Sequence, residues 1–302
     1  MKPVERLELR DLTPADVDDA IALAIAQGWR DRRRFYDLVL RTSTSRARVG
    51  MIHGQIVATG IATANGPVGW LGGIVVDARF RARGYGRAMT ENLIQLLRAA
   101  GCSTVSLEAT NAGRPMYERM GFRLVTHYHQ LEAGHLDVRP APPAGTRVRA
   151  LEPADLPAVI ELDRAATAED RSAPLAVLAE AGGWILESAP TERSGGARGS
   201  GSGQAESDHG PIRGFLLPAE RSYGAVIAPR FEDGLFLLDL HRSVAPAEGH
   251  VRAGIPGEHI AAVHELQSRG WEETWQAPRL LLGPDVPWHP EWIWGQINSA
   301  MG

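Results

Sequence analysis

A run of arginines and glycines in residues 75–88 has the composition and spacing of an anion-binding loop. It reads Val75-Val76-Asp77-Ala78-Arg79-Phe80-Arg81-Ala82-Arg83-Gly84-Tyr85-Gly86-Arg87-Ala88. An apolar strand leads into it, and apolar residues at helical spacing follow it. Glycines let a backbone approach a ligand closely, and free N–H groups at a helix N-terminus bind a pyrophosphate. The arginines add charge of the matching sign.

Two common phosphate-binding motifs do not fit these residues. A P-loop requires Gly-Lys-Ser/Thr, which is absent from the run. A dinucleotide fingerprint requires a third glycine, and Met89 stands at that position. The remaining pattern is Arg-x-x-Gly-x-Gly, formed by Arg81, Gly84 and Gly86.

A second pattern follows about 30 residues later. It reads Leu107-Glu108-Ala109-Thr110-Asn111-Ala112-Gly113-Arg114-Pro115-Met116-Tyr117-Glu118-Arg119-Met120-Gly121-Phe122. With both patterns in this order, residues 7–134 resemble the GNAT superfamily of acyl-CoA-dependent N-acetyltransferases. There the first pattern is the pyrophosphate loop, and the second is a fifth strand, a short helix and Tyr-x-x-x-Gly-Phe.

The resemblance implies acetyl-CoA as acyl donor and an N-acetyltransferase reaction, in which a primary amine of a small molecule or peptide attacks the thioester directly in a ternary complex. It implies that a backbone N–H on the fourth strand polarises the thioester carbonyl. No metal is expected. The residues expected to bind the donor are Ile74, Val75, Val76, Arg81, Ala82, Arg83, Gly84, Tyr85, Gly86, Arg87, Ala88, Thr110 and Asn111.

The reaction needs a proton acceptor and a proton donor. An alkyl amine is protonated at neutral pH and must lose a proton before it attacks. Strand 70–76 contains no ionisable residue, so Glu108 on the neighbouring strand is the best candidate base, with relay through water as the alternative. The resemblance assigns the acid that protonates the CoA thiolate to Tyr117. Trp29 falls where relatives line the acceptor site.

An internal echo indicates that the chain is duplicated. Residues 9–23 and 148–162 share seven of fifteen positions, and both read as a strand, a turn with proline and an amphipathic helix. We predict an α/β (α+β) fold of two tandem GNAT-like domains, each a mixed, splayed sheet flanked by helices. The expected boundaries are a catalytic domain at 1–139, a linker at 140–145 and a second domain at 146–302.

The second domain is expected to be degenerate. Residues 224–234 contain no Arg-x-x-Gly-x-Gly, and Glu232 and Asp233 stand where a pyrophosphate would need donors. This domain is therefore predicted to bind no cofactor. Residues 188–211 hold six glycines and five serines, a composition typical of a flexible insertion.

Composition excludes several other classes of protein. Of 302 residues, 32 are basic and 36 acidic, and 44% are apolar. The lone Cys102 excludes an internal disulfide framework and fits a reducing compartment. With no apolar run long enough for a membrane span and no basic, aromatic-interleaved face, we expect a cytoplasmic protein that binds neither membrane nor nucleic acid. The tryptophan-rich tail leaves a monomer or a homodimer open.

The charge is divided unequally between the halves. Residues 1–144 carry 19 basic and 14 acidic side chains, a net charge of +5, whereas residues 145–302 carry 13 and 22, a net charge of −9. We therefore expect the second domain to wall the acceptor site and to supply negative charge for a cationic amine.

Two alternative functions remain open from the sequence. One is a non-catalytic regulatory protein that binds acyl-CoA. The other is a mycothiol-synthase-like tandem acetyltransferase, in which the competent domain is the C-terminal one, the reverse of this chain.

Overall fold

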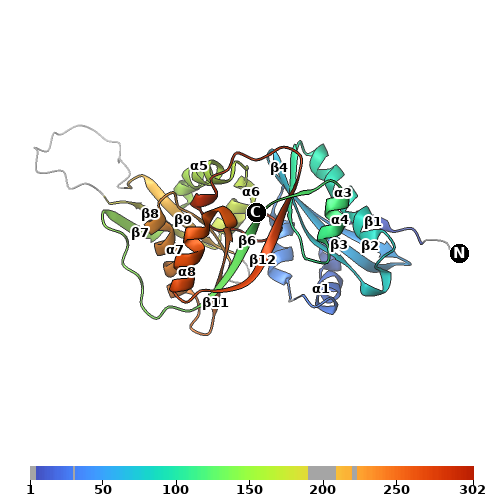
Figure 1. Ribbon diagram of the computed structural model, residues 1–302, viewed down its shortest axis with the longest axis horizontal. Helices are drawn as coiled ribbons and strands as arrows, with labels where there is room; N and C mark the ends of the chain where they lie inside the picture. The colour runs from blue at the N-terminus through green and yellow to red at the C-terminus, as the bar shows by residue number, and fades with distance from the viewer. Residues whose placement is uncertain (1–4, 30, 190–208, 220–222) are drawn as a thin grey trace, which may run out of the picture.

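Two mixed α/β halves lie side by side in the computed structural model, which describes residues 5–29, 31–189, 209–219 and 223–302 (Figure 1). The larger sheet has eight strands in the order β1-β2-β3-β4-β5-β12-β6-β11, and the smaller has five in the order β13-β10-β9-β8-β7. Helices flank both sheets. The predicted α/β fold class is confirmed, with the difference that the described strands of the smaller sheet are all antiparallel rather than mixed.

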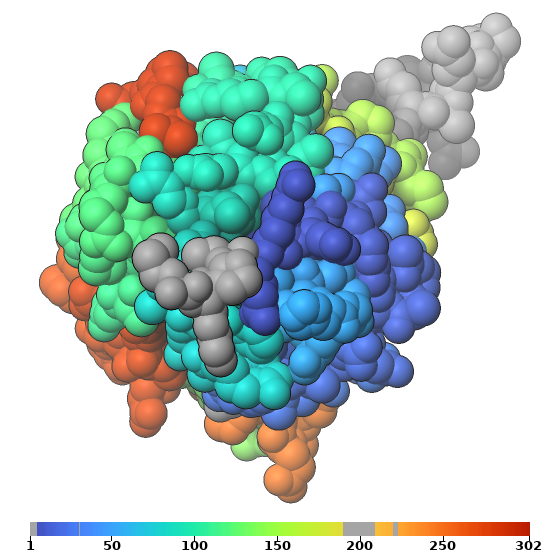
Figure 2. All heavy atoms as spheres, turned by 90° about the vertical axis from the view of Figure 1, so that its right-hand side faces the viewer, coloured from blue at the N-terminus to red at the C-terminus, as the bar shows by residue number. Residues whose placement is uncertain are grey.

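The first half forms an antiparallel meander followed by a parallel strand. Its elements are β1 (Glu8–Asp11), α1 (Val17–Ala26), α2 (Arg33–Arg41), β2 (Ser45–Ile52), β3 (Gln55–Asn65), β4 (Val68–Val76), α3 (Tyr85–Ala99), β5 (Thr104–Glu108), α4 (Arg114–Arg119) and β6 (Arg123–Gly134). Seen from its end, residues coloured blue to teal cover most of the face, and orange and red residues of the second half reach only its edges (Figure 2).

Strands β4 and β5 diverge about halfway along β4. They pair in parallel only from Val68 to Leu71. Beyond that point β4 stays with β3 alone, where the register shifts between Thr59 and Ile61. Gly73 takes φ +59°, and its carbonyl accepts a hydrogen bond of 2.9 Å from the Thr59 hydroxyl. The splay leaves one edge of β4 open from Gly72 onward.

The second half repeats the first at its beginning. It comprises β7 (Thr146–Ala150), α5 (Leu156–Thr167), α6 (Ser172–Ala179), β8 (Trp184–Ser188), β9 (Ile212–Pro218), β10 (Gly224–Ile227), α7 (Phe231–Val244), β11 (His250–Pro256), α8 (Ile260–Ser268), β12 (Glu272–Leu282) and β13 (Ile293–Gly295). The similar segments 9–23 and 148–162 each contain the same arginine–aspartate ion pair. Arg10 binds Asp16 through two bonds of 2.7 Å, and Arg149 binds Asp155 at 2.6 and 2.7 Å.

The two halves exchange their long late strands. Strand β12 of the second half lies between β5 and β6, and β11 pairs with the other edge of β6, all antiparallel. Each exchanged strand contributes its apolar side chains to the hydrophobic core of the other half. Leu131 of β6 packs with Leu186 and Trp271 of the second half, whereas Leu280 of β12 packs with Leu93 and Val105 of the first.

In the second half, the splay is filled by the chain itself. Strand β13 pairs with the edge of β10. Trp294 is fully buried there, and a Cβ at Gly234 would lie 2.0 Å from its ring. Asp233 is buried in a two-bond pair with Arg213, both bonds 2.8 Å long. The tryptophan-rich tail is therefore built into the interior here, along the edge of β10.

The predicted boundaries at 139 and 146 stay a prediction, although the exchanged strands place β12 in the sheet of the first half. Most of the predicted insertion at 188–211, namely residues 190–208, lies outside the described residues. Among the residues that the structure describes, no helix is long and apolar enough to cross a membrane.

The exchange predicts that the halves unfold together. Leu131→Ala removes a side chain that is 1% exposed and should lower the free energy of unfolding by about 2–5 kcal/mol. Leu124→Ala, on the same strand but 39% exposed, is the control and should cost less than about 1 kcal/mol. Urea unfolding followed by circular dichroism and by tryptophan fluorescence should give one shared transition; two separate transitions would contradict the exchange.

Candidate active site

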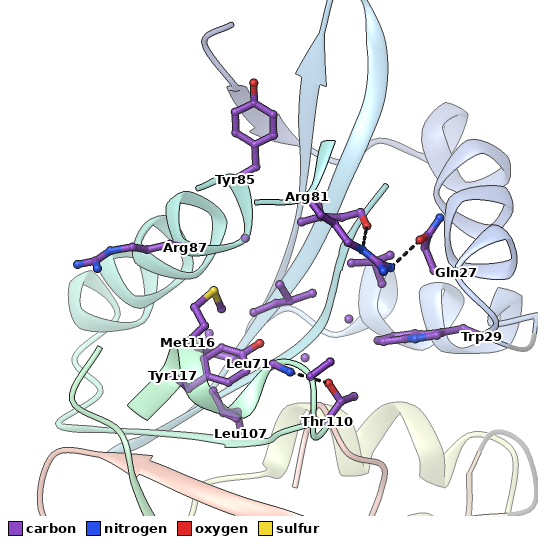
Figure 3. A pocket seen from close by; sticks show the side chains of 18 of the residues that line it. Gln27, Trp29, Leu71, Arg81, Tyr85, Arg87, Leu107, Thr110, Met116 and Tyr117 are labelled. Atoms are coloured by element: carbon purple, nitrogen blue, oxygen red, sulfur yellow. Dashed lines mark hydrogen bonds between the residues drawn. The ribbon is translucent and has the colours of Figure 1, made fainter. Parts of the chain in front are cut away.

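A cavity of about 1030 Å³ opens where β4 leaves β5. Its wall is formed by the loop between α1 and α2, by β4, and by the loop and first turn that begin α3. The end of β5 and α4 complete it. Figure 3 shows the side chains of Tyr117, Thr110 and Trp29 around this space, with Trp29 on the side opposite α3 and α4. The second half adds Trp275 and Ser299.

The loop before α3 is shaped to bind an anion. Gly84 has φ +84°, and Ala82 has φ +59°, a conformation that residues with a Cβ rarely adopt. In the first turn, the N–H of Ala88 donates to the carbonyl of Gly84 at 2.9 Å. The N–H groups before it in α3 have no carbonyl one turn back to bond, so they are available to a ligand at the positive end of the helix. Such backbone strain at a ligand loop is typical of binding sites.

The loop arginines do not all face the cavity. Arg81 lines it and donates to the side chain of Gln27 at 2.6 Å and to the carbonyl of Val76 at 3.2 Å. The side chain of Arg87 is directed away from the other residues drawn and pairs with Glu91 at 2.7 Å (Figure 3). Arg81 and Arg87 both border the cavity, and the Arg81 guanidinium is held there by Gln27 and Val76.

Tyr117 lies in α4 with its hydroxyl toward the cavity (Figure 3). Its ring packs edge-on against Phe122 at 5.8 Å between centroids, which fixes its direction. Burial raises the pKa of the phenol to about 12, and a hydrogen bond with Thr90 opposes the rise. The phenol therefore stays protonated at neutral pH and can serve only as a proton donor or a hydrogen-bonding group.

Glu108 is the one carboxylate among the described residues that line the cavity. Gln296 donates to its Oε1 at 2.7 Å, and Gln130 donates to its Oε2 at 3.2 Å. Burial raises the pKa of the carboxyl to about 7, against the opposing effects of the two amides and of Arg279. A carboxyl with a pKa near the working pH is suited to act as a general base.

The side of the cavity near Trp29 is aromatic and cationic rather than acidic. The Arg32 guanidinium lies 5.2 Å from the ring centroid of Trp29 and 4.0 Å from that of Phe35. No carboxylate of the second half, within its described residues, lines the cavity. The expectation that the second half supplies negative charge here is therefore wrong, because its surplus acidic groups lie elsewhere.

Most of the residues predicted from the sequence meet in this one cavity. Those on its wall are Trp29, Ile74, Val75, Val76, Arg81, Ala82, Gly84, Tyr85, Gly86, Arg87, Glu108, Thr110 and Tyr117. Tyr85 contributes through its backbone, since its hydroxyl donates to the carbonyl of Glu5 at 2.7 Å, away from the cavity.

Three predicted donor-binding residues lie off the cavity wall. Arg83 bonds Glu5 at 3.2 Å, the N–H of Ala88 is used within α3, and Asn111 lies beyond Thr110 outside the lining residues. Sequence reasoning missed Gln130 and Gln296. Neither belongs to a motif, and Gln296 is 188 positions from the carboxylate that it bonds.

His129 of β6 contacts a carboxylate of β12. His129 Nδ1 lies 3.1 Å from a carboxylate oxygen of Glu273. Within the part of the chain that the structure describes, no three His, Cys, Asp or Glu side chains are placed to hold a metal ion together.

Comparison with known proteins finds relatives for the part of the chain that forms most of the cavity wall. The profile described as "Acetyltransferase (GNAT) family" covers residues 9–122. Glucosamine 6-phosphate N-acetyltransferase of Trypanosoma brucei brucei is 38% identical over 56 residues, which are 18% of this chain and 38% of that protein. The chain thus matches only about two fifths of the length of this curated relative.

Solved structures resemble both halves together. A protein of Pyrococcus horikoshii aligns with a TM-score of 0.77 and 17% identity over 98% of this chain and 96% of its own. A tandem GNAT protein from the clavulanic acid biosynthesis pathway aligns with a TM-score of 0.58 and 16% identity over 93% of this chain and 100% of its own. At these identities the likeness shows the fold.

The fold and the site define an α/β protein with an anion-binding loop at a helix N-terminus beside a splayed strand. Within it, residues 9–122 are similar to the GNAT acetyltransferase family.

The raised pKa of Glu108 predicts a pH-dependent stability. Between pH about 4.5 and 7 the folded carboxyl keeps its proton while the unfolded one loses it, so stability falls as pH rises. Glu108→Gln should remove this loss. The free energy of unfolding of the variant, relative to that of the wild type, should therefore be higher at pH 8 than at pH 5 by on the order of 2–3 kcal/mol. Urea unfolding of both proteins at the two pH values measures this, and equal differences at both would contradict it.

Proposed function

We propose that this chain is an N-acetyltransferase that transfers the acetyl group of acetyl-CoA to a primary amine of a small molecule or peptide. The observation that carries the proposal is one cavity that joins an anion-binding loop to a carboxyl with a pKa near 7 and a protonated phenol. The name of the trypanosomal relative, an N-acetyltransferase acting on an amino sugar phosphate, supports an amine as acceptor.

The loop and the open edge of β4 would hold the donor. The N–H groups of the first turn of α3, together with Arg81, supply donors for the diphosphate. The open edge of β4 at residues 74–76 offers unpaired backbone groups along which an amide-bearing pantetheine arm can pair like an added strand. An N–H on this edge would polarise the thioester carbonyl.

The acceptor amine would approach between Glu108 and Trp29. The Glu108 carboxylate takes the proton from the ammonium, and the neutral amine nitrogen then attacks the carbonyl carbon. The tetrahedral intermediate collapses as the C–S bond breaks. Tyr117 protonates the departing thiolate, and the second proton lost by the attacking nitrogen restores the phenol, so the products are the amide, CoA with its thiol restored and the proton held by Glu108.

The two alternatives make different demands on the structure. A binding protein without catalysis has no use for a cavity carboxyl whose pKa lies near 7. A mycothiol-synthase-like arrangement would place the competent site in the second half, whose splay is filled by β13. Both observations favour catalysis in the first half.

Gly84→Glu should abolish donor binding, because it puts a carboxylate and a disfavoured φ into the anion loop. Acetyl-CoA affinity is expected to fall about 100-fold or more. Gly54→Glu is the matched control: Gly54 also has positive φ, +76°, and open space around it, but lies in the turn between β2 and β3. Calorimetry measures both, and an equal loss in both would contradict the loop's role.

Glu108→Gln should lower kcat/KM by about 10²–10⁴-fold while acetyl-CoA still binds. In the wild type, kcat/KM should rise with pH through about 7, as the carboxyl ionises, and this limb should vanish in the variant. The readout is CoA thiol release from acetyl-CoA across a panel of amines at pH 5.5–9. No amine-dependent thiol release by the wild type would overturn the proposed function.

Tyr117→Phe should leave donor binding and folding intact, since the buried ring and its contact with Phe122 remain. Loss of the acid should reduce kcat by about 10²-fold. Turnover and calorimetry on the same preparation test this, and unchanged kcat would exclude the phenol as the acid.

A further inference from the structure

The carboxylate of Glu108 is held by the other half of the molecule. It stands at the end of β5, directly opposite Arg279 of β12. Its Oε1 accepts a hydrogen bond of 2.7 Å from the amide of Gln296, which follows β13. Gln296 is itself 1% exposed, so this bond is shielded from water.

A connected set of amides fixes both carboxylate oxygens. The Gln130 amide donates to Oε2 of Glu108 at 3.2 Å and to Oε1 of Gln296 at 3.1 Å. The Gln130 carbonyl in turn accepts from the hydroxyl of Tyr223 at 3.1 Å. The set therefore runs from the second half, through β6, to the cavity.

The backbone of the second half is shaped around the Gln296 side chain. A Cβ at Gly254 on β11 would lie only 2.0 Å from the Gln296 Oε1. Glycine at this position lets the amide lie flat against the strand with its N–H toward Glu108. Two separate elements of the second half, β11 and the segment after β13, thus combine to place one donor.

From this geometry we propose that the second half completes the catalytic site: Gln296, seated on Gly254, is a positioning residue that orients the Glu108 carboxylate and stabilises its ionised form for proton abstraction. The inference rests on the proposed function only in giving Glu108 the role of base. A donor bonded to a carboxylate favours the charged form, so loss of that donor raises the pKa of the carboxyl.

Other groups that face Glu108 act in known directions. Arg279 on β12 favours the carboxylate. Tyr128 on β6 lies close enough to be affected by Glu108, and Glu169 and Arg171 act on the same phenol. Burial raises the pKa of Tyr128, so its phenol is neutral over the range in which Glu108 titrates. A change at Gln296 alone should therefore appear as a shift of the Glu108 midpoint.

The test compares Gln296→Met with two further variants. Gly254→Ala should displace the same amide while leaving the chemical identity of every side chain that contacts Glu108 unchanged. Gln267→Met, on the exposed side of α8, makes the same chemical change away from the site and is the control. The midpoint of Glu108 is measured by ¹³C NMR of glutamate labelled at the side-chain carboxyl, with its signal assigned by its loss in Glu108→Gln.

Gln296→Met and Gly254→Ala should raise this midpoint by about one pH unit, and Gln267→Met should leave it unchanged. In thiol release, the rise of kcat/KM with pH should move upward equally, which lowers kcat/KM about fivefold at pH 7, with acetyl-CoA affinity unchanged. An unmoved NMR midpoint in Gln296→Met would overturn the inference. If the midpoint moves but the wild type transfers no acetyl group, the positioning of Glu108 stands and the proposed function fails.

Discussion

The antiparallel pairing of β6 with β12 is the constraint on which the molecule depends. It runs over most of both strands and places each half's late strand in the other half's core. Around the junction, buried polar groups are matched across the chain. Glu169 of the second half accepts from Trp70 at 2.9 and 3.0 Å and from Asn65 at 2.9 Å. A buried carboxylate needs such donors, so the halves are held in one relative position.

The two halves differ at the edge of their fourth strands, β4 and β10. In the first half, the splay between β4 and β5 stays open and leads to the anion loop. In the second, β13 and Trp294 occupy the corresponding space, and Asp233 is neutralised by Arg213. The segment that fills this space in the second half continues to Gln296, which donates a hydrogen bond to Glu108 of the first half.

Sequence patterns predicted the elements whose formation depends on residues close together in the chain. The strand at residues 70–76, the loop and the helix that follows it lie close to where the sequence pattern placed them, because turn residues and apolar spacing act within a few residues. Glu108 was indicated as the base by elimination along β4. Its raised pKa could not be foreseen, because the burial and the amide partners come from β6 and the second half. The sequence also could not predict the strand exchange, because the apolar pattern of β6 or of β12 would fit the sheet of either half.

The central proposal is that the first half binds one acetyl-CoA and that the second half, whose corresponding space is filled by β13, supports this site. The most direct measurement is the stoichiometry of acetyl-CoA binding to the full chain, by isothermal titration calorimetry at known active concentration. The account predicts one acetyl-CoA per chain. Two per chain would contradict the filled second splay, and no binding would contradict the site itself.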